Sequence, residues 1–211
     1  MTATHQDDAL EAGRKLFARP AQFVWAAQTL DQLPAPALPE IAFAGRSNAG
    51  KSSLLNALTG QGRLARVSHT PGRTRQLNFF ELDGRLMLVD LPGYGYARAS
   101  RELKNAWQDT MFDYLRGRPT LRRIVLLMDC RVGPKESDAE AMALFDRAAV
   151  PFSIVLTKAD DAEPPELAAR VAEAEALARA HPAGHPTVFA TSSRTGAGIP
   201  ELRAELATLA A

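Results

Sequence analysis

The chain has 211 residues, 46% of them hydrophobic, so it is long enough to bury a full core, and a single domain is the first expectation. The formal net charge is only +1. A lone cysteine, Cys130, excludes an internal disulfide bond and any zinc site built from several cysteines, which fits a reducing compartment.

Residues 1–37 are interpreted as an N-terminal appendage and residues 38–211 as the main domain. The opening MTATHQDDALEAGRKLF contains acidic residues and lacks the apolar core of about 7–15 residues found in a secretory signal. FVWAA (23–27) fits either a strand or part of a helix, and LPAPALP (33–39) fits a stiff joint. No stretch approaches the roughly 18 uninterrupted apolar residues of a membrane span, so we expect a soluble cytoplasmic protein.

Six short apolar runs, rich in β-branched or aromatic residues, predict strands. They are EIAFA (40–44), LNFFEL (77–82), RLMLVD (85–90), RIVLLMD (123–129), FSIVLT (152–157) and TVFAT (187–191). Asp83 and Gly84 form a two-residue hairpin signal, so the second and third strands should pair antiparallel. Helix-length segments separate the others, which is typical of parallel β-α-β crossovers.

Apolar stripes with helical spacing predict the helices. Leu103, Trp107, Met111 and Tyr114 form one stripe, and Leu202, Leu206 and Leu209 form another. The alanine-rich segment 162–180 fits an amphipathic helix. The predicted fold is therefore an α/β three-layer sandwich, with helices on both faces of a six-stranded, mostly parallel sheet that has one antiparallel hairpin at its edge.

The stretch GRSNAGKS (45–52) joins a predicted strand to a predicted helix and matches the P-loop motif G-x-x-x-x-G-K-[ST]. Gly45 and Gly50 let phosphate approach backbone N–H groups, and the helix start adds its positive dipole end. Lys51 should reach the β- and γ-phosphates, and Ser52 should bind Mg²⁺. A glycine-rich turn that contains a lysine by chance is the alternative. The predicted nucleotide-binding residues here are Gly45, Arg46, Ser47, Asn48, Ala49, Gly50, Lys51, Ser52 and Ser53.

LVDLPGYG (88–95) places Asp90 at the carboxyl end of a strand, where α/β folds bind ligands. Asp90 suits a magnesium ligand held through water. Gly93 can donate its N–H to a γ-phosphate without steric hindrance. The D-x-x-G pattern is common by chance, but its position at a strand end, downstream of a P-loop, makes it informative.

LTKAD (156–160) follows another strand and predicts the base site. The Asp160 carboxylate accepts two hydrogen bonds, and guanine offers N1–H and an exocyclic amine side by side, whereas adenine presents an acceptor at N1. Lys158 can lay its alkyl stem along the base. TSS (191–193) follows the last strand, and Ser192 and Ser193 would contact the guanine O6 or brace the loop of Asp160.

With these segments in this order, the chain resembles the EngB (YihA/YsxC) family of bacterial GTPases, within the TrmE–Era-like group. The resemblance runs from about Phe23 to the C-terminus and rests on PEIAFAGRSNAGKSSLLNAL, TPGRTRQLNFFEL, LVDLPGYGYA, LTKAD and TSS. It implies that residues 38–211 form a six-stranded P-loop GTPase domain that binds GTP and GDP, hydrolyses GTP and uses Mg²⁺. It also implies a role in assembly of the large ribosomal subunit and in cell division and septation.

The resemblance implies residue roles as well. Thr157 and Thr191 join the nucleotide-binding set; many GTPases have asparagine where Thr157 stands, but EngB-like proteins commonly carry threonine. The polar segment SHTPGRTRQ (68–76) fits a mobile loop and corresponds to the first switch, with Gly72 and Thr74 at the nucleotide. The predicted metal ligands are Ser52, Thr74 and, through water, Asp90.

Many GTPases place a glutamine after the D-x-x-G glycine to orient the attacking water, and here that residue is Tyr94. Its phenol lacks the reach and the basicity for this task, so a slow intrinsic rate is expected. In related TrmE-like GTPases, an asparagine at the position of Asn48 ligates K⁺ beside the phosphates, which makes K⁺ a second candidate cofactor. The alternative is that Asn48 hydrogen-bonds its own loop. The predicted catalytic residues are Lys51, Thr74 and Asn48.

The small net charge hides an uneven distribution. Residues 63–131 hold 13 Lys/Arg against 7 Asp/Glu, a balance of +6, and residues 132–211 hold 7 against 12, a balance of −5. The basic side chains singled out are Arg66, Arg73, Arg75, Arg98, Arg101, Lys104, Arg116, Arg118, Arg122 and Arg123. They are either solvated helix faces or a surface for an anionic partner, for which ribosomal RNA or the large ribosomal subunit is the favoured candidate. Neither DNA nor a membrane is expected.

Three functions compete on this evidence. The favoured one is a GTP-hydrolysing switch. A P-loop ATPase or small-molecule kinase would leave Asp160 and Lys158 without a purpose, and neither a lid nor an acceptor site is evident. A nucleotide-dependent binding module with negligible hydrolysis is the third, because Tyr94 replaces the glutamine.

Overall fold

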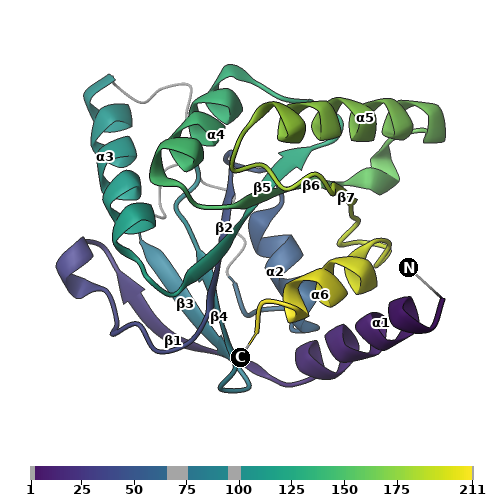
Figure 1. The fold of residues 1–211 in the computed structure, drawn as a ribbon, viewed down its shortest axis with the longest axis horizontal. Coiled ribbons are helices and arrows are strands. Elements are labelled where there is room, and N and C mark those ends of the chain that lie inside the picture. The colour runs from purple at the N-terminus through teal and green to yellow at the C-terminus, as the bar shows by residue number, and fades with distance from the viewer. Residues whose placement is uncertain (1–2, 66–75, 95–100, 211) are drawn as a thin grey trace.

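The computed structural model describes residues 3–65, 76–94 and 101–210 (Figure 1). Within these residues, seven strands form one sheet in the order β1-β3-β4-β2-β5-β6-β7. The strands are β1 (Ala21–Ala27), β2 (Glu40–Gly45), β3 (Leu77–Leu82), β4 (Leu86–Asp90), β5 (Leu121–Asp129), β6 (Phe152–Thr157) and β7 (Phe189–Ala190). Strand β2 is parallel to its neighbours β4 and β5, and β6 and β7 continue in the same direction.

The predicted fold class is confirmed, but the strand count and the place of the hairpin differ. β3 and β4 pair antiparallel across the turn at Asp83 and Gly84, which both have positive φ. The hairpin is not at the edge, because β1 pairs antiparallel with β3 on its outer side. The FVWAA segment is therefore strand rather than helix, and the Phe23 ring packs edge-on against Phe80 with centroids 5.9 Å apart.

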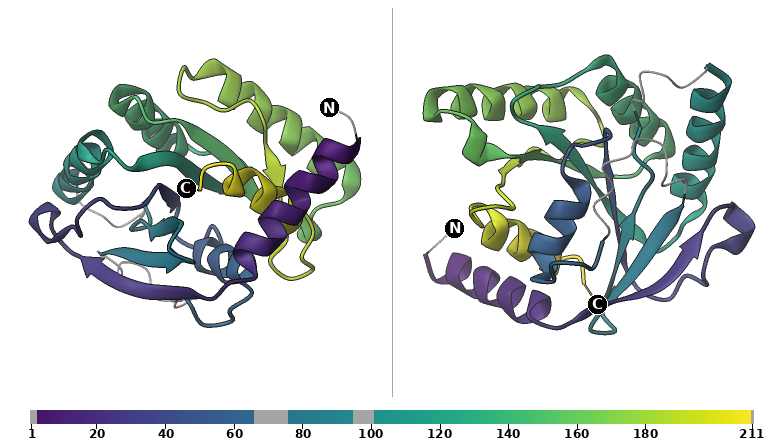
Figure 2. Two further views of the ribbon diagram at one scale, coloured as in Figure 1. Left: turned by 60° about the horizontal axis from the view of Figure 1, so that its bottom comes forward. Right: turned by 180° about the vertical axis from the view of Figure 1, so that it is seen from behind.

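Helices cover both faces of the sheet (Figures 1 and 2). They are α1 (Ala3–Phe17), α2 (Lys51–Thr59), α3 (Arg101–Gly117), α4 (Glu136–Ala148), α5 (Pro164–Ala180) and α6 (Ile199–Ala207), with short 3-10 turns at η1 (Leu30–Gln32) and η2 (Ala159–Asp161). One core lies between the sheet and α3, α4 and α5. The other lies between the sheet and α1, α2 and α6. This is the three-layer sandwich predicted from the alternation of strands and helices.

The apolar stripes account for how these helices pack. Met111 and Tyr114 of α3 are buried, and so are Leu202 and Leu206 of α6. The side chains of Leu103 and Trp107 fall outside the described part of the chain. None of the helices in the described residues is both long and apolar enough to cross a lipid bilayer.

Helix α1 lies along α6, and the two helices approach very closely at Gly13 (Figure 2). A Cβ at Gly13 would lie 2.5 Å from the backbone nitrogen of Ala204, closer than any side chain permits. Arg203 of α6 donates to the carbonyls of Leu58 (2.8 Å) and Ala57 (3.0 Å) at the end of α2. The N-terminal helix and α6 therefore support the helix that carries the P-loop lysine.

The prediction that the basic residues near the end of α3 lie on the surface is wrong for two of them, Arg118 and Arg123. Arg118 is buried and binds the buried Glu40 at 2.6 Å and the Pro34 carbonyl at 2.6 Å. Arg123 donates to the Ser153 hydroxyl at 2.8 Å, and its side chain is only 12% exposed. Arg118 is internal because Glu40, buried at the start of β2, needs a cation to neutralise its charge, and Arg123 is held by Ser153 and by Glu205 at 3.4 Å. Residues that looked like a charged surface in the sequence are therefore internal partners.

Candidate functional site

The predicted site residues of the described chain gather at the carboxyl edge of the parallel strands. Gly45 ends β2, Asp90 ends β4 and Thr157 ends β6, while Thr191 directly follows β7. Because parallel strands end at the same side of a sheet, segments more than a hundred residues apart meet there. The edge combines a phosphate loop, two carboxylate-bearing loops and a hydroxyl-bearing loop.

The P-loop contains two residues with left-handed backbone conformation just before its helix begins. Gly50 has a φ of 92° and Asn48 a φ of 67°, both in the left-handed region, and α2 begins at Lys51. Glycine adopts such a φ at little cost, which is why the turn into the helix is built on one. At the end of β2 there is little room for a side chain, since a Cβ on Gly45 would lie 3.1 Å from its β5 neighbour Leu127 and 3.4 Å from Ala49 of the loop.

Lys51 and Asp90 form an ion pair, with side chains 13% and 8% exposed. These are the residues predicted to meet the phosphates and, through water, the metal ion, and the pair shows that they lie within reach of one another. The residues present fit Mg²⁺, which prefers oxygen ligands and keeps several waters and substrate phosphates in its shell. Ser52 and Asp90 would supply the hydroxyl and the carboxylate. Among the described residues there is no cluster of three acidic, histidine or cysteine side chains that would hold a metal ion alone.

The segment after Asp90 lies directly on the P-loop. The Tyr94 N–H donates to the Gly45 carbonyl (3.3 Å), and the Ser47 N–H donates to the Tyr94 carbonyl (3.1 Å). A Cβ on Gly93 would lie 3.4 Å from the Ser47 nitrogen, so this glycine allows a close backbone approach. The main chain of this segment is therefore hydrogen-bonded directly to the main chain of the P-loop.

The Tyr94 side chain contacts the start of α4. It is buried, and its hydroxyl donates to Asp138 Oδ1 at 2.8 Å. The other Asp138 oxygen accepts the Lys135 N–H at 2.9 Å at the start of α4. Burial, and then the Asp138 carboxylate, raise the pKa of Tyr94 well above its ordinary value. The phenol thus anchors the segment to α4, a role that the sequence did not suggest.

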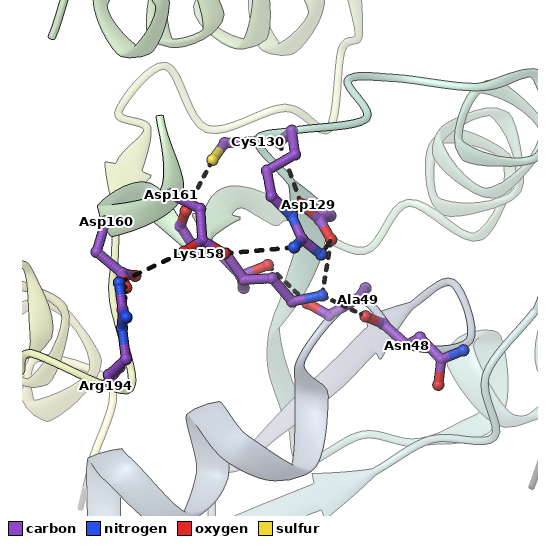
Figure 3. A network of polar contacts seen from close by, with 10 residues as sticks. Asn48, Ala49, Asp129, Cys130, Lys158, Asp160, Asp161 and Arg194 are labelled. Atoms are coloured by element: carbon purple, nitrogen blue, oxygen red, sulfur yellow. Dashed lines mark hydrogen bonds and ion pairs between the residues drawn. The ribbon is translucent and has the colours of Figure 1, made fainter. Parts of the chain in front are cut away.

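The loop that follows β6 and carries Lys158 and Asp160, here called the base loop, is hydrogen-bonded to the P-loop by two side chains (Figure 3). The Thr157 hydroxyl donates to the Ala49 carbonyl at 2.6 Å. Lys158 Nζ donates to the Asn48 carbonyl at 2.9 Å. Lys158 has a left-handed φ of 59°, and its own carbonyl accepts the Cys130 thiol at 3.0 Å. Thr157 therefore connects this loop to the P-loop, although threonine is shorter than the asparagine that many GTPases have at this position.

Asp129, at the end of β5, belongs to this network but was not singled out in the sequence. Its Oδ2 accepts Lys158 Nζ at 2.7 Å, and Arg131 donates to both of its oxygens (Figure 3). Although burial opposes ionisation, the hydrogen bonds from Arg131 and then Lys158 lower the pKa of Asp129 to about 2. Its position in the sequence could have indicated this role, because Asp129 ends an apolar strand as Asp90 does.

Asp160 lies on the far side of the base loop, next to the segment after β7. Hydrogen bonds from Ser192 and then from Arg194 lower its pKa. Ser192 is fully buried, and its oxygen accepts the N–H groups of Arg194 (3.2 Å) and Thr195 (3.0 Å). Of the two roles considered for Ser192, the structure shows the bracing contacts. Ser193 is exposed, and Arg194 was missed.

Several predictions are not addressed by these contacts. Gly72 and Thr74 of the first switch lie outside the described residues. Asn48 is exposed, and among the described residues no hydrogen bond joins its carboxamide to another group. In Figure 3 that carboxamide points away from the Lys158 network, which lends no support to the interpretation that it hydrogen-bonds its own loop.

Comparisons with known proteins agree with this geometry. A family model described as 50S ribosome-binding GTPase matches residues 40–158. The chain is 62% identical over 201 residues to the probable GTP-binding protein EngB of Granulibacter bethesdensis, covering 95% of this chain and 90% of the relative. It is 58% identical to the protein of that name from Gluconobacter oxydans, with coverages of 95% and 88%. Its fold is similar to the crystal structure of a probable GTP-binding protein engB, with a TM-score of 0.62 and 23% identity over 81% of this chain and 97% of the other.

Proposed function

The chain belongs to the EngB family of GTP-binding proteins, and on that premise we propose that it is a GTP-hydrolysing switch that assists assembly of the large ribosomal subunit. The observation that carries the nucleotide site is the contact of the base loop with the phosphate loop. Lys158 and Thr157 bond to the carbonyls of Asn48 and Ala49, so base and phosphates are read by one connected unit. An ATPase or kinase would leave this base loop without a purpose.

Each part of the site has a proposed task. Residues 45–53 bind the phosphates through backbone N–H groups, and Lys51 moves from Asp90 to the β- and γ-phosphates when nucleotide enters. Asp160 reads guanine. Ser52, Asp90 through water, and Thr74 hold Mg²⁺, which supplies neutralisation of the phosphate charge when bound. The remaining members of the proposed site are Gly72, Gly93, Thr191, Ser192 and Ser193.

Hydrolysis by the isolated protein is proposed to be slow. The Tyr94 hydroxyl is engaged with Asp138 inside the protein, so it does not orient a water at the γ-phosphate. Without a glutamine there, positioning of the water depends on other groups. If the rate were negligible, the protein would be a nucleotide-dependent binding module instead of a GTPase. A measurement of GTP turnover distinguishes these two functions.

Potassium is expected to accelerate GTP hydrolysis relative to sodium, through the Asn48 carboxamide. A cation beside the phosphates would neutralise charge that develops during the reaction, and loss of one such charged contact corresponds to a rate change on the order of ten-fold. Phosphate release is measured in KCl and in NaCl at equal ionic strength. Asn48→Ala should abolish the difference between the salts while GDP affinity stays within about two-fold. Equal rates of the parent protein in the two salts would assign Asn48 a structural role.

The proposed partner is ribosomal RNA of the large subunit, contacted through its phosphates, and the protein is expected to act in the cytoplasm and to support cell division and septation. With Arg118 and Arg123 engaged inside the protein, the candidate contacts are the groups near the first switch and after Asp90, together with the exposed Arg116 and Arg122. The backbone bonds between the P-loop and Tyr94 give the segment after Asp90 a direct link to the bound phosphates. A partner docked there would therefore respond to the state of the nucleotide.

The partner proposal is tested by co-sedimentation with large ribosomal subunits over a salt series. Binding of the GTP-loaded protein should exceed that of the GDP-loaded protein and weaken steeply with salt. Changing Arg98 and Arg101 together to alanine should reduce the log–log slope by about one unit for each phosphate contact removed. Arg179→Ala, an exposed arginine on α5, should leave the slope unchanged. An unchanged slope in the double variant would contradict the proposed surface.

A further inference from the structure

Arg194 holds the carboxylate that is proposed to read the base. Its Nε and Nη2 both lie 2.5 Å from Asp160 Oδ2, and Nη2 also lies 3.4 Å from Asp161 Oδ1 (Figure 3). The Arg194 side chain is 72% exposed, whereas that of Asp160 is only 13% exposed. Hence an exposed, solvated cation contacts a carboxylate that is otherwise nearly enclosed.

The Arg194 guanidinium and the edge of a guanine base carry similar hydrogen-bond donors. A guanidinium presents two neighbouring N–H groups attached to one carbon, and such a fork suits a carboxylate. The edge of guanine that would face Asp160 presents N1–H and the exocyclic amine, also attached to one carbon. Arg194 therefore presents to Asp160 two donors on one carbon, as a guanine base would, with both donors on the single oxygen Oδ2 in this structure.

We propose that Arg194 occupies the position of the guanine edge on Asp160 in the nucleotide-free protein and is displaced when the base binds. The inference rests on the proposed function, in which Asp160 is the base reader. It adds an internal competitor to that site, because a base that reaches Asp160 must first displace Arg194, and guanine then replaces both donors. Adenine, with an acceptor at N1, displaces the arginine without replacing its hydrogen bonds.

The surroundings allow this displacement. The backbone around Arg194 is fixed, since the Ser192 oxygen accepts the N–H groups of Arg194 and Thr195, so only the side chain has to move. Asp161, already within 3.4 Å of Nη2, remains as a partner for the displaced guanidinium. Exposed ion pairs stabilise a structure only weakly, so the exchange does not prevent nucleotide binding.

The proposal predicts a specific kinetic signature for Arg194→Ala. If the Arg194–Asp160 pair exists only in the nucleotide-free protein, removing Arg194 raises the fraction of protein molecules in which Asp160 is free to bind a base. The association rate constant for GDP and the affinity should both rise about two- to five-fold, the range expected for an exposed ion pair, while the dissociation rate constant stays unchanged. Arg194→Lys, which keeps the charge but lacks the fork, should lie between the two proteins.

These rate constants are measured by stopped flow with GDP that carries a fluorophore on its ribose, and Arg179→Ala serves as the matched control. Faster dissociation in Arg194→Ala would mean that Arg194 contacts the bound base, and unchanged rates would mean that the pair does not compete with it; either result overturns the proposal. In an Asp160→Asn background, where the carboxylate is absent, Arg194→Ala should no longer change association of the corresponding xanthosine diphosphate. If Asp160→Asn did not alter the preference between GDP and xanthosine diphosphate, the proposed function of Asp160 would fail, which is a separate result.

Discussion

Asp160→Asn is expected to shift the nucleotide preference from guanine to xanthine. The asparagine oxygen still accepts the N1–H of the base, but its amide donates where guanine carries an amine and xanthine carries a carbonyl oxygen. GDP should weaken on the order of 10- to 100-fold, because a hydrogen bond to a charged acceptor becomes a contact between two donors. Xanthosine diphosphate should gain affinity, since a repulsive contact becomes a hydrogen bond.

The measurement is a competition titration of both nucleotides against a labelled nucleotide, in parent and variant proteins. Asp161→Asn is the matched control, because Asp161 is adjacent to Asp160 but its carboxylate is paired with Arg131 at 3.3 Å. It should keep the guanine preference. Unaltered affinities for both nucleotides in Asp160→Asn would show that another residue reads the base.

Arg118→Met is expected to destabilise the fold by about 3–5 kcal/mol, because it leaves the buried Glu40 carboxylate without its cation. Arg118 and Glu40 are 6% and 2% exposed at their side chains, and the neighbouring Tyr114 and Thr120 hydroxyls donate to the same carboxylate. Those two hydroxyls satisfy hydrogen bonds but do not neutralise the charge. The cost is therefore that of a buried unpaired ion.

Urea unfolding of the nucleotide-free proteins measures this effect. Arg122→Ala, four residues away and exposed, should change the free energy of unfolding by less than about 0.5 kcal/mol. A double variant, Glu40→Gln with Arg118→Met, should recover part of the loss, because neither charge is then buried alone. A loss below about 1 kcal/mol in the single variant would mean that water reaches Glu40 and that the pair is not a buried one.

The fold was predictable from the sequence wherever local patterns decide it. Alternation of apolar runs with helical spacing predicted the strands from Glu40 onward, and the Asp83–Gly84 signal predicted the one hairpin. The edge strand β1 was ambiguous, because five apolar residues in a row fit either a strand or a helix and only pairing with β3 decides between them. Gly13 was unremarked because its role depends on the proximity of Ala204, which is remote in the sequence.

The candidate site was predictable in its parts but not in its connections. The P-loop, Asp90 and Asp160 could be named because each follows a strand in a recognisable local pattern. The contacts of Arg194 with Asp160, of Tyr94 with Asp138 and of Arg118 with Glu40 join segments 34 to 78 residues apart. A sequence shows the charge of such residues but not which partner neutralises it. This is why Arg118 resembled a surface cation.

The most direct test of GTP hydrolysis at this site is a measurement of phosphate release from GTP and from ATP, in the presence of Mg²⁺. The purified parent protein is compared with Lys51→Ala, which sets the background rate. Lys51→Ala must first be shown to remain folded, because its loss also leaves Asp90 without its cation. The account predicts slow but measurable turnover of GTP, turnover of ATP at background level, and loss of GTP turnover in the variant. Equal turnover of ATP and GTP by the parent protein, or undiminished GTP turnover in folded Lys51→Ala, would contradict it.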